Sequence, residues 1–176
     1  VAGVDTAYRA DVSIGAAVVL DYNTLSVVES RKARVKTRFP YIPTLLSFRE
    51  IPPTLAAVNK LKTQPDVFLV DGQGIAHPYR LGFASHLGLI LNKPTIGVAK
   101  SLLCGTVGSF NQRGWAPIVD KDEIIGAAVS RKSEKTVCVS VGHMVSLKTA
   151  IAIVKHCTPL HRIPEPIRAA HIMANV

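Results

Sequence analysis

The segment Val67-Phe68-Leu69-Val70-Asp71-Gly72-Gln73-Gly74-Ile75-Ala76-His77-Pro78 predicts the centre of the fold. Its first four residues are all apolar, which is typical of a short strand buried in a parallel or mixed sheet. The strand ends on the carboxylate of Asp71, and Gly72 and Gly74 leave space beside that charge. Open α/β sheets bind ligands at the carboxyl ends of their strands, so one interpretation is a functional site. The other is an ordinary Asp-Gly turn.

The composition predicts one globular domain that spans residues 1–176. Of the 176 residues, 48% are hydrophobic and 19% are charged, which excludes a disordered chain. This length suffices for one buried core and is too short for two ordinary domains. The 21 Lys and Arg against 12 Asp and Glu give a net charge of +9. Such an excess suits a polyanionic partner such as nucleic acid, although a merely basic protein without such a partner fits it too.

The cysteines and the hydropathy pattern bear on the compartment. Cys104, Cys138 and Cys157 are odd in number and lack the close spacing of a disulfide framework or a zinc site. They suit the reducing cytoplasm, and we expect a cytoplasmic protein. No apolar run approaches the roughly 18 residues of a membrane helix, and no signal peptide is recognisable at Val1. We therefore expect no membrane association.

Three strands open the chain and predict an antiparallel meander. They are 1–5, 12–20 and 25–36, and the first one again ends on an acid, Asp5. Alternation along the third strand predicts one apolar face and one basic face. The apolar face comprises Val27, Ala33 and Val35, and the basic face comprises Lys32, Arg34 and Lys36.

The later elements alternate between helix and strand. A helix is expected over 45–62, with Pro52-Pro53 as an interruption or a restart, and another over 79–91. Strands are expected at 67–70, 94–98, 115–119, 124–130 and 136–141, a loop at 105–114, and helices at 146–156 and 167–175. This order predicts an α/β fold with a ribonuclease H-like mixed sheet flanked by helices. Asp5, Glu50 and Asp71 would then come from the first strand, the first helix and the fourth strand.

Several motifs follow one another along nearly the whole chain. The first half contains Val1-Ala2-Gly3-Val4-Asp5, Tyr41-Ile42-Pro43, Ser47-Phe48-Arg49-Glu50-Ile51-Pro52 and the Asp71–Pro78 segment. The second half contains Arg80-Leu81-Gly82-Phe83-Ala84-Ser85-His86-Leu87-Gly88, Pro94-Thr95-Ile96-Gly97-Val98-Ala99-Lys100, Gly142-His143 and Arg162-Ile163-Pro164-Glu165-Pro166-Ile167-Arg168. In this order they resemble the endonuclease V family, whose members act on inosine.

The resemblance implies a magnesium-dependent endonuclease, in which Mn²⁺ can substitute for Mg²⁺. Its partner would be DNA containing deoxyinosine, cut at the second phosphodiester bond on the 3′ side for DNA repair, and the protein would act as a monomer. One alternative is the same chemistry on inosine-containing RNA. Another is a catalytically weak nucleic-acid-binding protein, against which the retention of all three carboxylates argues.

The resemblance also implies roles for individual residues of the reaction centre. Carboxylates are the hard oxygen ligands that magnesium prefers, and a two-ion site would activate a water and stabilise the leaving oxygen. Asp5, Glu50 and Asp71 would bind the metal, and His171 would be a ligand or a polar partner of the second ion. Lys100 would place a cation near a phosphate oxygen. The alternatives are caps or surface ion pairs for the carboxylates, a structural histidine and a solvated lysine.

For the substrate, Tyr41-Ile42-Pro43 would be a wedge that enters the duplex where the altered nucleotide turns out. The alternative is a hydrophobic staple before the helix. The base pocket would be lined by Thr44, Leu46, Gly72 and Gly82. His77 would orient water or contact the substrate, unless it belongs to an ordinary turn. Candidate phosphate contacts are Arg80, Lys32, Arg34 and Lys36, each of which could equally be solvated.

The sequence departs from the family pattern at several places. Thr44 replaces the usual glycine, so we expect a different backbone position against the base. Gln73 replaces a frequent histidine, and His171 stands where many relatives have aspartate. The family's N-terminal helix and long basic C-terminal tail are absent here. Because the chain begins directly on a predicted strand, we expect an upstream segment, and we expect the missing parts to affect affinity more than chemistry.

Overall fold

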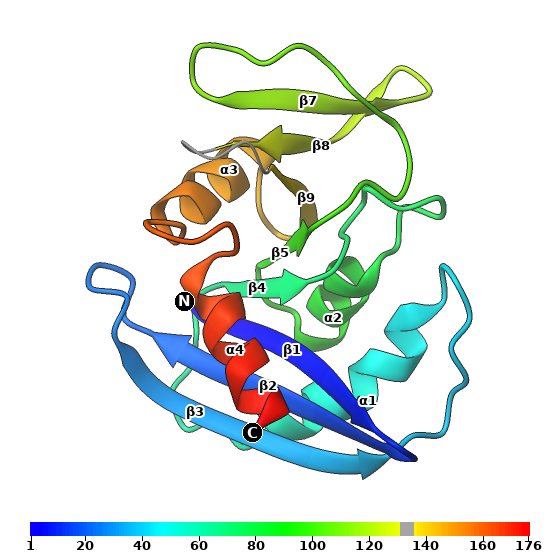
Figure 1. Cartoon of the computed structure of the whole chain (residues 1–176), viewed down its shortest axis with the longest axis vertical. Coiled ribbons are helices and arrows are strands. Elements are labelled where there is room, and N and C mark those ends of the chain that lie inside the picture. The colour runs from blue at the N-terminus through cyan, green and yellow to red at the C-terminus, as the bar shows by residue number, and fades with distance from the viewer. Residues whose placement is uncertain (131–135) are drawn as a thin grey trace.

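The computed structural model describes residues 1–130 and 136–176, which form one mixed sheet between two layers of helices (Figure 1). Within these residues the sheet has nine strands in the order β3-β2-β1-β4-β5-β9-β8-β7-β6. The strands are β1 (Ala2–Arg9), β2 (Val12–Leu20), β3 (Val27–Lys36), β4 (Phe68–Asp71), β5 (Thr95–Ala99), β6 (Thr106–Val107), β7 (Trp115–Asp120), β8 (Glu123–Val129) and β9 (Val137–His143). The helices are α1 (Leu46–Val58), α2 (Phe83–Leu91), α3 (Leu147–His156) and α4 (Glu165–Asn175).

The strand directions confirm the predicted ribonuclease H-like fold. Strands β1, β2 and β3 form an antiparallel meander, and β1, β4 and β5 run parallel to one another. The pairing of β1 with β4 ends at Val4 and Val70, the residues immediately before Asp5 and Asp71. Both carboxylates therefore lie where two neighbouring parallel strands stop pairing, which is where such sheets bind ligands.

The helices cover the two faces of the sheet in pairs. Helices α1 and α2 pack on one face in a cluster that includes Val4, Ala17 and Val70. Helices α3 and α4 pack on the other face in a cluster that includes Val18 and Leu69. Alternation along each strand accounts for this division, because successive side chains point to opposite faces.

Two glycines allow the helices closest to the site to approach the sheet. A Cβ atom on Gly3 would lie 2.0 Å from the carbonyl oxygen of Pro166, at the start of α4. A Cβ atom on Gly15 would lie 2.1 Å from the carbonyl oxygen of Pro53 in α1. No side chain fits at either position, so both helix backbones rest directly on the strands.

The structure corrects several predicted boundaries. Helix α1 ends at Val58 instead of residue 62, and it continues through Pro52 and Pro53 instead of restarting. The contact of Pro53 with Gly15 holds this turn against β2, which compensates for the missing amide hydrogens. Helix α2 begins at Phe83 instead of residue 79, because Arg80 has a left-handed φ of 54° and Gly82 is extended. The predicted loop 105–114 contains the short strand β6.

The β3 prediction was correct for the basic residues and wrong for Val27. Ala33 is buried in the cluster with α1, so Lys32, Arg34 and Lys36 alternate to the opposite face of this edge strand. Val27 is 59% exposed, because a bulge between Val19 and Leu20 interrupts the alternation near the start of β3.

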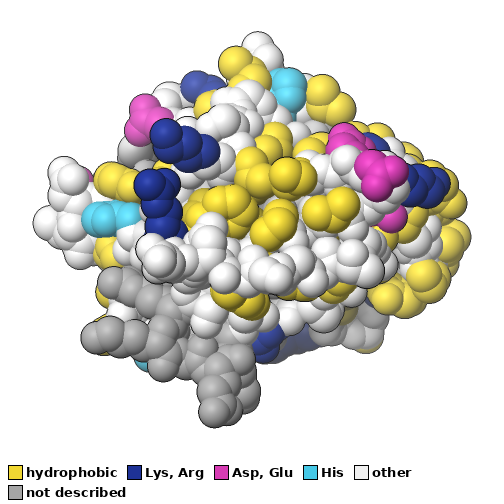
Figure 2. Space-filling model, turned by 90° about the horizontal axis from the view of Figure 1, so that it is seen from above, with side chains coloured by type: hydrophobic (Ala, Val, Ile, Leu, Met, Phe, Trp, Pro, Cys, Tyr) yellow, Lys and Arg dark blue, Asp and Glu magenta, His cyan; other side chains and the backbone are white. Residues whose placement is uncertain are grey.

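At the opposite edge of the sheet, seen from above, apolar side chains form a band between groups of basic and acidic residues (Figure 2). The exposed large apolar residues in this part of the chain include Leu103, Val107, Phe110 and Ile124. This face therefore lacks a continuous basic surface in the residues that are described. None of the described helices is long and apolar enough to cross a membrane.

Candidate active site

The three carboxylates expected from the sequence interact with one another. Asp5 lies in the middle of β1, Glu50 lies in the second turn of α1, and Asp71 is the last residue of β4. Asp5 and Glu50 are each only 8% exposed. Burial, followed by the charges of Asp5 and Asp71, raises the pKa of Glu50 to about 8. Burial and the charge of Asp5 also raise the pKa of Asp71. Buried acids that raise one another's pKa values in this way are typical of functional sites.

A tyrosine and an arginine accompany Glu50. The Tyr8 hydroxyl donates a hydrogen bond of 3.5 Å to Glu50 Oε1, and Arg49 lies over the Tyr8 ring at 4.2 Å. Burial, with the nearby charge of Glu50, raises the pKa of Tyr8, so the phenol remains protonated. The other oxygen of Glu50, Oε2, is buried and has no hydrogen-bond partner among the described residues. A buried carboxylate oxygen without a partner is costly, so this oxygen is one that a bound cation would satisfy.

His171 and Lys100 supply positive or polar partners for the other two acids. His171 lies on α4, and its Nδ1 atom is 2.7 Å from Oδ2 of Asp5 on β1, the strand on which α4 packs. Lys100 follows β5, and its Nζ lies 3.7 Å from Asp71 Oδ2. The sequence predicted both residues near the carboxylates, and the structure brings them there. Their catalytic roles stay predictions.

The donor set fits magnesium by its chemistry. Three carboxylates provide hard oxygen ligands, and a divalent cation among them would favour their ionised forms over the proton. Within residues 1–130 and 136–176, no three His, Cys, Asp or Glu side chains already surround a single point closely enough to hold a metal. A cation among these carboxylates would offset the burial and repulsion that raise the pKa values of Glu50 and Asp71, and it would give the unpartnered Glu50 oxygen a partner.

A pocket of about 160 Å³ opens beside these acids. All four residues expected around a base lie in its wall: Thr44, Leu46, Gly72 and Gly82. A Cβ atom on Gly82 would lie 2.4 Å from the Gln73 carbonyl oxygen, so only glycine permits this close approach of backbone to backbone. Tyr41 and Pro43 line the pocket as well, whereas Ile42 does not. Tyr41 is 67% exposed, as a side chain available for stacking should be.

His77 lies in the pocket wall but is mostly buried, at 4% exposure. Its Nδ1 accepts a hydrogen bond from the Tyr79 amide, and the ring also bonds to the Thr44 backbone. Burial lowers the pKa of His77, so the neutral ring is favoured. The imidazole thus ties the segment around Thr44 to the loop that follows β4.

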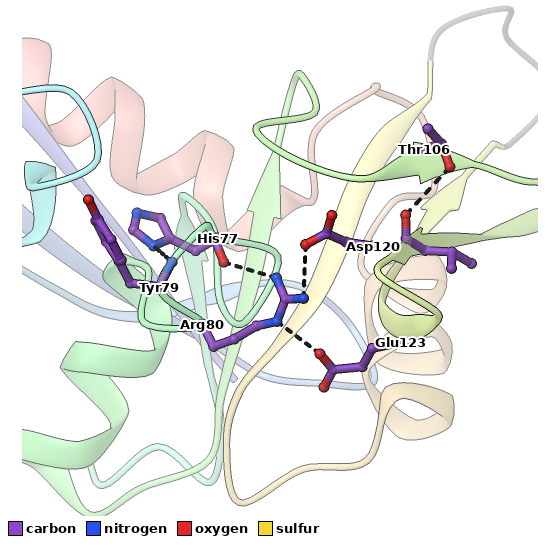
Figure 3. Close-up of polar contacts among 7 residues, drawn as sticks. His77, Tyr79, Arg80, Thr106, Asp120 and Glu123 are labelled. Carbon is purple, nitrogen blue, oxygen red and sulfur yellow. Dashed lines mark hydrogen bonds and ion pairs between the residues drawn. The ribbon is translucent and has the colours of Figure 1, made fainter.

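Arg80 is not directed into the pocket. Its guanidinium lies 2.9 Å from both Asp120 and Glu123, at the tip between β7 and β8, and donates to the His77 carbonyl oxygen at 3.2 Å (Figure 3). The guanidinium therefore forms a clamp between the pocket loop and the hairpin, and its expected role as a phosphate contact stays a prediction. Sequence alone could not show this, because the acids lie 40 and 43 residues away.

The departures from the family pattern have structural consequences. Thr44 adopts a φ of 69°, so it keeps the left-handed conformation that glycine would adopt easily. The expected difference from the family's backbone position at Thr44 stays a prediction. The Gln73 amide donates to the Ser101 carbonyl oxygen at 2.9 Å, which fixes the side chain beneath the pocket.

Sequence reasoning missed part of the pocket wall. Ser47, Leu81, Phe83 and Leu103 also line it. Three of them belong to the quoted motifs, so their proximity to Leu46 and Gly82 could have suggested them. Leu103 lies in the loop after β5 and gave no signal, because only the folded chain brings that loop beside α2.

Comparison with known proteins agrees with this geometry. A family profile described as Endonuclease V matches residues 1–172. Endonuclease V of Thermofilum pendens is 50% identical over 175 residues, which cover 98% of this chain and 75% of that protein. The crystal structure of Endonuclease V from Streptomyces avermitilis has a TM-score of 0.95 and 44% identity, and the match covers 99% of this chain and 79% of that one.

A third relative has been solved with nucleic acid. Ciona intestinalis Endonuclease V, in complex with a 24mer DNA containing an inosine followed by a ribo-adenosine, has a TM-score of 0.86 and 36% identity. That match covers 99% of this chain and 83% of the other. Since the family profile spans nearly all residues and the relatives match in both sequence and fold, the chain belongs to the Endonuclease V family of nucleases.

Proposed function

We propose that this protein is a magnesium-dependent endonuclease that recognises deoxyinosine in DNA and cuts the second phosphodiester bond on its 3′ side, in DNA repair. The observation that carries this proposal is the group of acids Asp5, Glu50 and Asp71 beside the pocket built around Gly72 and Gly82. The inosine-containing DNA bound by the Ciona relative supports inosine as the recognised feature.

The carboxylates would hold the metal, with Mn²⁺ as a substitute for Mg²⁺. When bound, these ions supply an activated water and neutralise charge on the leaving oxygen. His171 would fix the orientation of Asp5 through its 2.7 Å contact, and from that position it would either hold this metal ligand in place or bind the metal itself. Lys100, beside Asp71, would present its ammonium group to a phosphate oxygen.

Recognition would use the pocket and the exposed tyrosine together. A flipped base would enter the space between Leu46, Gly72 and Gly82, where backbone groups are close to the surface because side chains are small. Tyr41, with Ile42 and Pro43, would fill the gap left in the duplex, since stacking on an aromatic ring replaces part of the lost base stacking.

The protein would act in the cytoplasm as a monomer. All three cysteines are free thiols, and two of them are buried, as a reducing compartment permits. Inosine-containing RNA is the alternative substrate, because the same acids and the same base pocket could serve the same chemistry on RNA.

One experiment tests the proposal directly. Matched DNA and RNA oligonucleotides with inosine or adenosine are incubated with the wild type and with Asp71→Asn, with and without magnesium. We expect magnesium-dependent cutting of inosine DNA by the wild type and none by Asp71→Asn, because the amide loses the metal-binding charge. Binding of inosine DNA in calcium should persist in the variant. Normal cutting by Asp71→Asn would exclude Asp71 from the site, and preferred cutting of RNA would identify RNA as the substrate.

A further inference from the structure

A second cavity, of about 330 Å³, lies at the ends of β2 and β3 and against the first turns of α1. We call it the basic groove, and its wall includes Ser13, Lys36, Arg38, Phe39, Phe48 and Arg49. Its size is in the lower range of ligand-binding pockets, which is roughly 300–1,000 Å³. The proposed function leaves this groove without a role.

The charge of the groove suits a phosphate group. Three of its lining residues are cationic and none is acidic. In the part of the chain that is described, neither Lys36 nor Arg38 takes part in an ion pair with an acid. The hydroxyls of Ser13 and Thr37 lie 2.6 Å apart in the same wall and can reorient to donate a hydrogen bond. The groove therefore offers positive charge that the protein itself does not neutralise.

The groove also offers an aromatic surface. Phe39 and Phe48 have ring centroids 5.5 Å apart, tilted by 30°, so each supports the other. Phe48 is 49% exposed although it is large and apolar. A supported and exposed ring beside cations is the combination that binds single-stranded nucleic acid, because bases stack on the ring while the cations contact the backbone.

The sheet order places the carboxylates between the groove and the pocket. The groove lies at β3 and β2, Asp5 lies on the next strand, β1, and Asp71 ends the following strand, β4. The pocket lies beyond, around Gly72 and Gly82. Helix α1 joins all three, because Ser47 lines the pocket, Phe48 lines the groove and Glu50 belongs to the acids. A nucleic-acid strand that places one base in the pocket and a phosphate at the acids would therefore continue toward the groove.

We propose that the basic groove binds the nucleotide on the 3′ side of the cut, with its phosphate at Arg38 and Lys36 and its base against Phe48. This polarity rests on the proposed function, since the cut lies on the 3′ side of the inosine held in the pocket. The groove then holds the far side of the scissile bond, so that the substrate strand is fixed on both sides of the carboxylates.

The test compares affinities for two single-stranded inosine oligonucleotides in calcium, with adenosine versions of both as references. One ends at the nucleotide before the cut, and the other extends about five nucleotides further in the 3′ direction. The wild type should bind the longer oligonucleotide more tightly. Phe48→Ala and Arg38→Gln should each lose about five-fold or more of the affinity for the longer oligonucleotide and none for the shorter.

Two matched controls should show no change. Phe110→Ala removes a phenylalanine of nearly the same exposure, 48%, from the loop between β6 and β7. Lys148→Gln removes an exposed cation from α3. Equal losses on both oligonucleotides, unchanged affinities for both, or a loss that appears only with nucleotides added on the 5′ side would each overturn the groove proposal. Failure of the wild type to prefer inosine to adenosine would instead overturn the proposed function.

Discussion

His171 Nδ1 lies 2.7 Å from Asp5 Oδ2, although 166 residues separate them along the chain. The contact depends on the packing of α4 on β1, where Gly3 lets the Pro166 carbonyl approach closer than any Cβ would permit. The last helix thus positions an acid that the first strand provides. A substitution at this contact between α4 and β1 should therefore disturb the position of Asp5 more than the positions of the other site residues.

We expect His171→Ala to lower the cleavage rate about 10- to 100-fold, as loss of a residue that orients a metal ligand does. Raising the magnesium concentration should restore part of the rate, because Asp5 remains and only its orientation is lost. His161→Ala is the control, since it removes another histidine–carboxylate contact, to Glu165. A rate loss that no magnesium concentration reduces would assign His171 a direct part in the reaction.

The raised pKa of Glu50 predicts an unusual pH dependence of stability without metal. The carboxyl group has an ordinary pKa of 4.5 and a pKa of about 8 in the folded protein, chiefly because of burial. Between these values the unfolded chain releases the proton and the folded one keeps it, so stability falls as pH rises. The melting temperature in a chelator should therefore be lower at pH 8 than at pH 5.

Two further measurements test whether Glu50 causes this pH dependence of stability. Glu50→Gln cannot titrate, so the variant should show a flatter profile of melting temperature against pH. Magnesium should stabilise the wild type more at pH 8 than at pH 5, since the ion competes with the proton for the carboxylates. An identical slope in Glu50→Gln would mean that other groups govern the pH dependence.

Thr44→Gly should stabilise the protein slightly. Thr44 is a β-branched residue at φ 69°, where the strain costs roughly 1–2 kcal/mol. Replacement by glycine would remove this strain, but the greater freedom of glycine in the unfolded chain would offset about 0.4–1 kcal/mol of the stabilisation. The net effect should be an increase of about 2 °C in the melting temperature. Thr44→Ala retains a Cβ atom and should give no such increase, and a lower melting temperature for Thr44→Gly would contradict the strain.

Arg80→Gln should weaken substrate binding through the pocket loop without changing its salt dependence. The substitution releases the loop between His77 and Gly82 from Asp120 and Glu123. We expect affinity for inosine DNA to fall by roughly three- to ten-fold, as loss of about 1 kcal/mol of ordering implies. The double variant Asp120→Asn, Glu123→Gln should behave alike.

A phosphate contact at Arg80 gives the opposite pattern. Loss of the arginine would then reduce the slope of log affinity against log salt by about 0.9, and neutralising the two acids would strengthen binding. Binding isotherms of both variants at several salt concentrations therefore distinguish the clamp from the contact.

The sequence alone determined the local features of this protein. Apolar runs that end on acids predicted β4 and the first half of β1, although β1 continues to Arg9 instead of ending at Asp5. Periodicity predicted the helices, because these patterns reflect which faces can be buried. The ordered motifs around Asp5, Glu50 and Asp71 indicated the family. The pocket residues Thr44, Leu46, Gly72 and Gly82 also came from those motifs, and the structure gathers them around one cavity.

Only the tertiary structure decided which distant groups meet. Arg80 turned out to bind two acids of the β7–β8 hairpin, and Leu103 to close the pocket, because contacts between segments far apart leave no periodic signal in either one. A distant contact also explains why α1 is continuous. Its prolines predict a break in the helix, but the packing of Pro53 on Gly15 of β2 holds the helix together. The pairing of β1 with β4 finally set the carboxylates side by side, since the register between strands depends on the whole sheet.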